Sequence, residues 1–311
     1  MNYSKIFNPP PPSTSNVTPV PAVADRLAQS VYIYTDEIIL AVNVALATGR
    51  PLLVRGPSGS GKSTLARNVA QSLNRRYYEH VVSSRTEARD LLWQVDLLRR
   101  LQDAQAKTLA ADFSRYVQPK VLWWAFDRAS ALQQLALAGQ PTSAEPGENT
   151  SSEQSVMLLD EIDKADPDVP NNLLVPLGSL TFDVSETGQK VAAAQAPLVF
   201  LTTNDERDLP PAFVRRCVEL KISNPSQTQL IQIGQAHFPA AAATLLQKVA
   251  ALFAPTSGEP IAGSPPSTAE YLDTIRACLT LNVSPGSAEF ETLSRVTVWK
   301  HGRSAITSAT K

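Results

Sequence analysis

Residues 56–63 read Gly56-Pro57-Ser58-Gly59-Ser60-Gly61-Lys62-Ser63, and this stretch decides how the rest of the chain is interpreted. It matches the phosphate-binding loop pattern G-x-x-x-x-G-K-[ST] in full. The glycines let the backbone curl until consecutive N–H groups face one anion, and the helix that follows adds the positive end of its dipole. We expect Lys62 to reach the β- and γ-phosphates of a nucleotide, and the Ser63 hydroxyl to ligate Mg²⁺. The candidate nucleotide-binding residues are Gly56, Pro57, Ser58, Gly59, Ser60, Gly61, Lys62, Ser63 and Thr64.

The residues on either side of this loop fit the same interpretation. Before it, Pro51-Leu52-Leu53-Val54 is an apolar run typical of a buried strand. After it, Leu65, Val69 and Leu73 recur at helical spacing. A strand, a glycine-rich loop and a helix in this order are the setting in which the pattern binds phosphate, so a chance match is disfavoured.

A second apolar run ends in two carboxylates, in Met157-Leu158-Leu159-Asp160-Glu161. Apolar residues on both faces indicate a central parallel strand, and ligands of open α/β sheets bind at the carboxyl ends of such strands. We expect Asp160 to hold Mg²⁺, directly or through water. Glu161 is the candidate general base, which accepts the proton of the water that attacks the γ-phosphate.

Asn204 follows a further apolar strand over residues 198–203. A polar side chain at that point can orient the attacking water beside Glu161. Taken without the other motifs, Asn204 would be an ordinary strand-ending asparagine that starts a turn.

Two arginines, Arg215 and Arg216, precede an alternating strand over residues 218–222. A guanidinium placed there can reach a phosphate in a neighbouring subunit and stabilise charge in the transition state, as an arginine finger does. Arg216 is the first candidate for this role and Arg215 the second. The alternative interpretation is that both are surface charges.

In this order the motifs resemble those of the AAA+ ATPases. Gly56–Ser63 resembles Walker A, and Leu159-Asp160-Glu161 resembles Walker B. Thr202-Thr203-Asn204 is similar to sensor 1, and Arg215-Arg216-Cys217 to the arginine finger. The resemblance covers about residues 30–300.

Within the AAA+ proteins the chain is similar to the MoxR group. The similarity lies in residues 83–92, in Leu122-Trp123-Trp124-Ala125 and in Leu209-Pro210-Pro211-Ala212-Phe213. A candidate hairpin over residues 182–191 and a segment inserted over about residues 85–120 fit the same group.

The resemblance implies a P-loop NTPase fold: a five-stranded parallel sheet with helices on both faces, followed by a small α-helical lid domain. It implies hydrolysis of ATP to ADP and phosphate, with ATP and Mg²⁺ as cofactors. It places the nucleotide at a subunit interface in a homo-oligomeric ring, usually a hexamer. It also implies chaperone-like remodelling or activation of a partner protein, often one with a von Willebrand factor A domain.

One expected feature of the family is missing from the sequence. A lid arginine, sensor 2, is expected near the start of the helix after Pro265-Pro266, but the chain reads Ser267-Thr268-Ala269-Glu270 there. Ala269 offers no charge to a γ-phosphate, and Arg276 lies two helical turns further along. The start of this helix therefore departs from the family pattern.

The order of the predicted elements divides the chain into parts. Residues 1–24 are rich in Pro, Ser and Thr, which predicts a disordered arm. Strands alternate with helices over residues 25–223, and helices alone follow over residues 224–311, which indicates an α/β domain and a small α domain. Within the first domain we expect one helix from Arg85 to about Lys107, and a mobile, exposed loop over about residues 139–155.

The composition argues against several classes of protein, among them nucleic-acid-binding, membrane and disulfide-rich proteins. A formal net charge of −1 over 311 residues provides no general attraction for nucleic acid or an anionic membrane. Two cysteines, Cys217 and Cys278, are too few for a disulfide framework and favour a reducing cytoplasm. No apolar run reaches membrane-spanning length, so we expect no membrane segment.

Other functions remain open at this point. A nucleic-acid or restriction-type NTPase motor subunit would share the motifs, but the near-neutral charge and the lack of a recognisable recognition domain argue against it. A non-hydrolytic nucleotide-dependent scaffold is favoured slightly by the missing sensor 2, and opposed by Glu161, Asn204 and Arg216. A monomeric kinase is a weaker alternative, since it does not need this ordered set of strand-end residues.

Overall fold

The computed structural model describes residues 3–10, 31–147, 150, 152–253 and 267–298. These residues belong to two compact units. The first is built from Met1–Pro9, Tyr34–Gly56 and Lys62–Lys221, and the second from Pro10–Ile33, Pro57–Gly61 and Ile222–Lys311. The last strand ends at Lys221, so every described helix after it belongs to the second unit.

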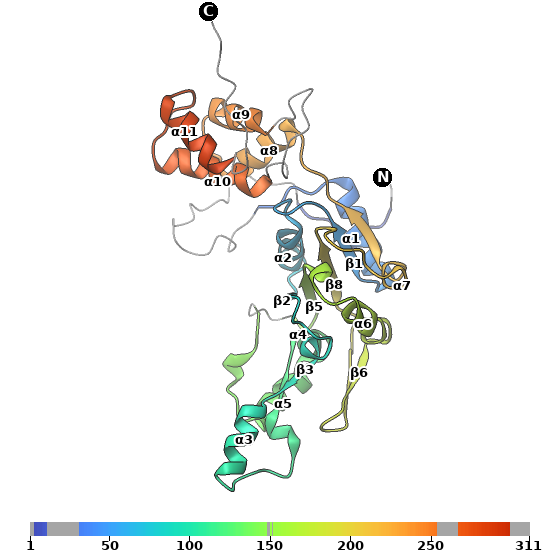
Figure 1. Ribbon diagram of the computed structural model, residues 1–311. Coiled ribbons are helices and arrows are strands. Elements are labelled where there is room, and N and C mark those ends of the chain that lie inside the picture. The colour runs from blue at the N-terminus through green and yellow to red at the C-terminus, as the bar shows by residue number, and fades with distance from the viewer. Residues whose placement is uncertain (1–2, 11–30, 148–149, 151, 254–266, 299–311) are drawn as a thin grey trace, which may run out of the picture. The chain divides into compact units, whose positions relative to one another are not determined.

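A five-stranded parallel sheet forms the centre of the first unit (Figure 1). Its strand order is β2-β5-β8-β1-β9. In that order the strands comprise Arg76–Val81, Ser155–Asp160, Leu198–Thr203, Leu52–Arg55 and Val218–Lys221. Four of these strands, β5, β8, β1 and β9, are ones that the sequence patterns predict, and the α/β fold class is confirmed. Because β5, β8 and β1 are neighbours and parallel, their carboxyl ends share one edge of the sheet.

Helices cover both faces of this sheet. On β5, Met157 and Leu159 belong to the same buried cluster as residues of α4 (Val121–Phe126). Val156 and Leu158 alternate with them and are also buried, on the face where α2 (Lys62–Ser72) packs against β5. Residues 156–159 of this strand are apolar on both faces, as is typical of a strand whose two faces are covered by helices.

The N-terminal residues 3–10 pack against α1 (Asp36–Thr48). The Asn43 side chain accepts a hydrogen bond from the Phe7 N–H and donates one to the Phe7 carbonyl, both at 2.8 Å. Phe7 is only 1% exposed. The expectation of a disordered arm over residues 1–24 is therefore wrong at Phe7, while its residues 11–24 lie outside the described part of the chain.

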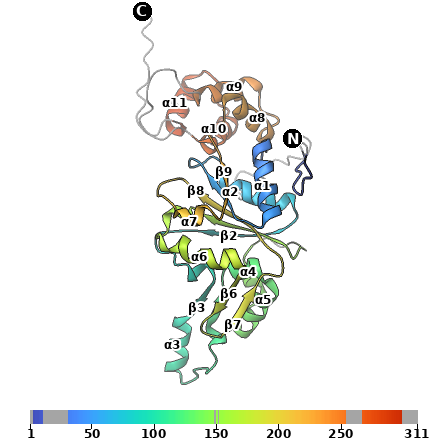
Figure 2. The same cartoon turned by 90° about the vertical axis from the view of Figure 1, so that its right-hand side faces the viewer.

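The residues between β2 and β5 form an inserted segment, and α3 lies at its far end from the sheet (Figure 2). In chain order the segment contains η1 (Arg89–Leu91), β3 (Trp93–Val95), α3 (Leu97–Gln105), η2 (Phe113–Tyr116), β4 (Val117–Pro119), α4, α5 (Arg128–Leu137) and η3 (Thr142–Ala144).

The single helix expected from Arg85 to about Lys107 is wrong. Trp93–Val95 is extended and pairs antiparallel with β4. The Trp93 ring also stacks on Phe182, with ring centroids 5.9 Å apart. Strand pairing and aromatic packing determine the backbone conformation here, because local helix propensity is a weak guide where tertiary contacts oppose it.

The loop after α5 is held against β2 by Glu145. This carboxylate accepts hydrogen bonds from Arg128 at 2.7 and 2.9 Å and from the Tyr78 hydroxyl at 3.2 Å, and it lies 3.5 Å from Arg76. The Glu145 side chain is 10% exposed. The expectation of a mobile, exposed loop over residues 139–155 is therefore wrong at Glu145.

A hairpin follows β5, after η4 (Ile162–Lys164) and α6 (Asp168–Ser179). Its strands are β6 (Thr181–Val184) and β7 (Gln189–Ala192), and the short helix α7 (Pro211–Val214) comes after β8. Phe182 on β6 packs edge-on against Trp123, and the Trp93 indole donates to Glu186 at 2.7 Å. The hairpin and the inserted segment therefore share one core.

In the second unit, the described helices α8–α11 gather into one cluster (Figure 1). They comprise Gln227–His237, Ala243–Leu252, Thr268–Thr280 and Ala288–Thr297. Their buried core includes Leu230, Leu246, Val249, Tyr271, Ile275 and Phe290. Among the residues that the structure describes, no helix has the length and apolar character needed to cross a membrane.

Candidate functional site

The glycine-rich loop links the end of β1 to the start of α2. Gly59 and Gly61 have φ angles of 72° and 90°, in a region that L-residues rarely adopt. The Ser60 N–H donates to the Pro57 carbonyl at 3.3 Å and closes a turn. Thr64 lies in the first turn of α2. The main chain thus has the curled form that the glycine pattern predicts.

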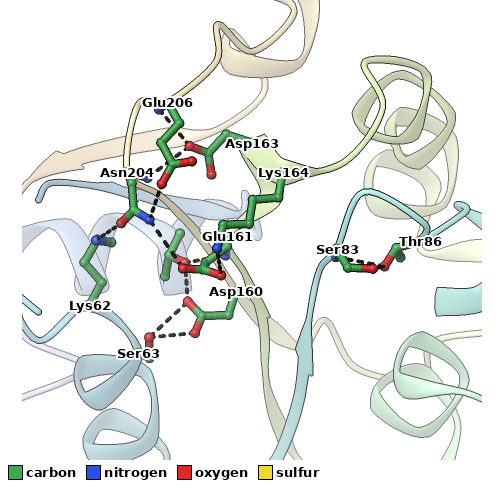
Figure 3. A network of polar contacts seen from close by, with 11 residues as sticks. Lys62, Ser63, Ser83, Thr86, Asp160, Glu161, Asp163, Lys164, Asn204 and Glu206 are labelled. Carbon is green, nitrogen blue, oxygen red and sulfur yellow. Dashed lines mark hydrogen bonds and ion pairs between the residues drawn. The ribbon is translucent and has the colours of Figure 1, made fainter. Parts of the chain in front are cut away.

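Lys62 is buried at the start of α2 and is only 6% exposed. Its ammonium donates to the Gly56 carbonyl at 2.8 Å and to Asn204 Oδ1 at 2.7 Å (Figure 3). Burial lowers the pKa of Lys62, while the carboxylates of Asp160 and Asp163 act against that shift. These acceptors hold the cation at the carboxyl edge of the sheet, where a phosphate can replace one of them.

Ser63 and Asp160 meet at the same edge. The Ser63 hydroxyl lies 2.9 and 2.8 Å from the two carboxylate oxygens of Asp160. The buried Thr202 hydroxyl on β8 donates to Asp160 as well, and accepts from the Glu161 N–H at 2.8 Å. A carboxylate and a hydroxyl oxygen side by side are ligands of the kind that Mg²⁺ prefers, so this pair fits the ion.

Glu161 follows β5 in the left-handed backbone region, with φ 60° and ψ 47°. Few residues other than glycine adopt this conformation, and such strain is concentrated at functional sites. Its Oε2 lies 2.6 Å from the Lys164 ammonium, and its Oε1 accepts from Asn204 Nδ2 at 3.4 Å. Figure 3 shows the Glu161 carboxylate between these two side chains.

Asn204 therefore connects the lysine of the loop to the candidate base. Its backbone is fixed by Asp163, whose Oδ2 accepts from the N–H groups of Asn204 at 3.2 Å and Glu206 at 3.0 Å. Asp163 is 2% exposed, and its Oδ1 has no hydrogen-bond partner among the described residues. The turn after β8 is thus held by a buried carboxylate that comes from the end of β5.

The sequence-predicted residues Lys62, Ser63, Asp160, Glu161 and Asn204 are brought together by three neighbouring strands. Three further residues of this cluster were not among the site predictions: Asp163, Lys164 and Thr202. Thr202 and Asp163 lie within a few positions of predicted site residues, and this closeness in sequence was the one indication of a role. It could not show which residues they contact, because Thr202 donates to Asp160 and Asp163 accepts from Asn204, each across two segments that are distant in sequence.

Arg215 and Arg216 lie away from this cluster. Val218 at the start of β9 pairs with Leu52 at the start of β1, whereas the glycine-rich loop follows the end of β1. The two arginines thus stand at the amino edge of the sheet, opposite the carboxyl edge that holds Lys62. The Arg216 guanidinium donates to the Leu174 carbonyl of α6 at 3.0 Å.

Within the second unit, Ala269 lies near the start of α10. Its N–H donates to the Gly59 carbonyl at 3.3 Å. The first turn of α10 is closed by a capping box between Ser267 and Glu270. Arg276, the alternative for sensor 2, is 2.9 Å from Asp273 on the same helix.

The family model for the AAA domain (dynein-related subfamily) matches residues 51–217. This match covers more than half of the chain, from the residue before β1 to the residue before β9. It includes the glycine-rich loop, the two strand-end carboxylates, Asn204 and both arginines. No curated protein matches the chain.

Two solved structures are similar to the chain. One is a candidate ATPase from Cytophaga hutchinsonii, which is 16% identical over 60% of this chain and 44% of its own, with a TM-score of 0.39. The other is a point mutant of RuvB from Thermotoga maritima, which is 15% identical over 84% of this chain and 68% of its own, with a TM-score of 0.47. The chain thus spans less than half the length of the first of these proteins.

Proposed function

We propose, since the chain belongs to the AAA domain family (dynein-related subfamily), that it binds ATP with Mg²⁺ and hydrolyses ATP to ADP and phosphate. The observation that carries the proposal is the position of Asn204. Its Oδ1 accepts from Lys62 at 2.7 Å and its Nδ2 donates to Glu161 at 3.4 Å. One amide thereby joins the phosphate-binding lysine to the candidate base.

The phosphates bind along the curled main chain of residues 56–61, with Lys62 at the β- and γ-phosphates. Ser63 and Asp160 hold Mg²⁺, which neutralises charge on the phosphate oxygens when bound. Their oxygens already lie within 3 Å of each other. Binding requires Lys62 to exchange one of its protein acceptors for a phosphate oxygen.

Hydrolysis needs a water in line with the bond between the γ-phosphorus and ADP. Asn204 orients that water, and Glu161 accepts its proton as the new P–O bond forms and the bond to ADP breaks. The ion pair between Glu161 and Lys164 competes with this proton transfer, because the ammonium occupies one carboxylate oxygen. Glu161 becomes available as Lys164 turns away toward solvent.

The test is Glu161→Gln, which keeps the shape of the side chain and removes its basicity. We expect ATP turnover to fall by at least about 100-fold, with ATP affinity unchanged. Glu37→Gln is the matched control, since Glu37 is an exposed carboxylate on α1. Unchanged turnover in Glu161→Gln would remove Glu161 as the base, whereas ATP binding without any turnover in the wild type would favour a non-hydrolytic nucleotide-dependent scaffold.

The arginines act on the nucleotide of a neighbouring subunit in a homo-oligomeric ring, with Arg216 as the finger and Arg215 as the second candidate. Their place at the edge of the sheet opposite Lys62 supports this, because they cannot serve the site of their own chain. Turnover should then rise more steeply than in proportion to protein concentration. Turnover that stays proportional to concentration in a strictly monomeric preparation would exclude the ring.

The biological role that we propose is remodelling or activation of a partner protein in the cytoplasm, as in the MoxR group. The similarity of residues 83–92 and 209–213 to that group supports the role, as do the two buried, unpaired cysteines. A partner with a von Willebrand factor A domain is the first candidate. The test is to identify the proteins that co-purify with the Glu161→Gln variant and leave when ADP replaces ATP.

A further inference from the structure

We propose that Arg50 is a positioning residue for the arginine finger: its guanidinium holds the turn that carries Arg215 and Arg216, and so sets how these arginines are presented to a neighbouring subunit. The inference rests on the proposed function, because it assigns Arg50 a task only if Arg216 acts on the nucleotide of another protomer.

The contacts of Arg50 concentrate on three consecutive carbonyls. Its Nε donates to the Arg216 carbonyl at 3.1 Å and its Nη2 to the Cys217 carbonyl at 2.9 Å. The same Nη2 also donates to the Arg215 carbonyl. A guanidinium can do this because its donors form a rigid, planar fork, whereas a lysine ammonium is a single point of charge.

These three carbonyls lie in the turn between α7 and β9, outside both elements. The helix α7 ends at Val214, so the carbonyls of residues 215–217 lie after it, where no further helical turn follows to supply N–H donors. The strand β9 begins only at Val218. Between these two elements the turn carries both arginines, and the Arg50 guanidinium supplies hydrogen-bond donors to its carbonyls.

Arg50 is itself fixed to the sheet. Gly49 before it ends α1 with φ 66°, and the carbonyl of Pro51 after it accepts from the Val218 N–H at 2.8 Å. The next residue, Leu52, begins β1 and pairs with Val218 in register. Arg50 therefore connects the arginine-bearing turn to the start of β1 in the central sheet.

The Arg216 side chain keeps room to move while its backbone is held. Its guanidinium donates to the Leu174 carbonyl at 3.0 Å, and it borders a cavity of about 820 Å³ that Arg50, Leu174 and Gly178 also line. The side chain can thus leave Leu174 and reach outward without any change in the contacts of Arg50. Arg50 thus fixes the backbone of the turn, while the Arg216 side chain remains able to change its position.

A mixing experiment separates this role from a general loss of stability. A Glu161→Gln protomer cannot hydrolyse ATP but presents intact arginines, and an Arg50→Ala protomer has an intact site with misplaced arginines. We expect Arg50→Ala alone to lose at least about tenfold in turnover while ATP affinity is retained. Mixed with Glu161→Gln it should regain activity, and mixed with Arg216→Ala it should not.

Control variants distinguish a failure of the Arg50 proposal from a failure of the proposed nucleotide site between subunits. Arg99→Ala removes a similar contact between a guanidinium and a backbone carbonyl, in the inserted segment, and should leave turnover unchanged. Arg50→Lys repeats the mixing test with a smaller change, should Arg50→Ala not fold. If Glu161→Gln restores Arg216→Ala but neither Arg50 variant, or if Arg50→Ala turns over like the wild type, the positioning role is wrong. If Arg216→Ala is not restored either, the shared site itself is wrong, and Arg50 loses its task with it.

Discussion

The Oδ2 atom of Asp163 accepts a hydrogen bond from the backbone N–H of Asn204 at 3.2 Å. The same oxygen accepts from Glu206 N–H at 3.0 Å, and the carboxylate is almost completely buried. Asp163 thus fixes the turn that carries the side chain proposed to orient the attacking water.

Replacing Asp163 by alanine should lower both stability and turnover. Two N–H groups would lose their acceptor, and because both are partly accessible to water the cost is about 0.5–1.5 kcal/mol each. A shift of Asn204 by about 1 Å can reduce turnover by up to about 100-fold. Asp163→Asn keeps an acceptor oxygen and should retain most of the activity. Urea denaturation and steady-state kinetics measure the two effects, and equal loss in both variants would show that the carboxylate charge, rather than the acceptor, matters.

Replacing Lys164 by glutamine should raise turnover. Lys164 lies 2.6 Å from Glu161, and the hydrogen bond to this carboxylate raises the pKa of Lys164, so the pair persists at neutral pH. Exposed pairs of this kind are worth about 0.2–1 kcal/mol. Releasing the base should therefore increase turnover by up to about fivefold under saturating ATP. A decrease would mean that Lys164 assists the reaction instead of restraining Glu161.

The sequence was sufficient for the sheet and for most of the candidate site, for a physical reason. Buried parallel strands are apolar on both faces, so Leu52–Arg55 and Ser155–Asp160 could be recognised without knowledge of their neighbours. Parallel pairing then brings the residues after these strands to one edge. The apolar pattern therefore predicts each strand, and the parallel arrangement of the strands then predicts which polar residues lie close together.

The parts that the sequence did not predict depend on contacts between distant residues. Asp163 and Asn204 are 41 positions apart, and the buried Asp163 carboxylate accepts from N–H groups in the turn after another strand, β8. Trp93 is extended because Val117–Pro119 and Phe182 lie beside it. Polar composition indicated an exposed loop around Glu145, because the sequence does not show which arginines it meets.

Glu145 should be a major stabilising residue of the first unit. Its partly buried carboxylate faces Arg76 and Arg128, and the Arg128 side chain is 25% exposed, so the ion pair is weaker than a fully buried one. Glu145→Ala should lower the free energy of unfolding by about 1–3 kcal/mol. Glu153→Ala is the control, since Glu153 is largely exposed and lies 4.0 Å from Arg128. A loss in Glu145→Ala no larger than in the control would show that the loop is not held by this carboxylate.

Stability should also depend on pH through His237, the last residue of α8. Burial lowers the pKa of His237 below its ordinary value near 6.5. The unfolded state therefore binds a proton at a pH where the folded state does not. The resulting stability is complete above about pH 6.5 and is lost as the pH falls toward the folded pKa.

The measurement is the difference in melting temperature between pH 7.5 and pH 5.5. A change of 1 kcal/mol corresponds to about 2–4 °C in proteins of about 150–250 residues, and to less in a longer chain. His237→Gln should reduce the difference, because glutamine does not titrate. Burial lowers the pKa of His80 as well, so His80→Gln should reduce it separately and the double variant should reduce it further. If the difference in His237→Gln equals that of the wild type, His237 is already accessible to protons in the folded state.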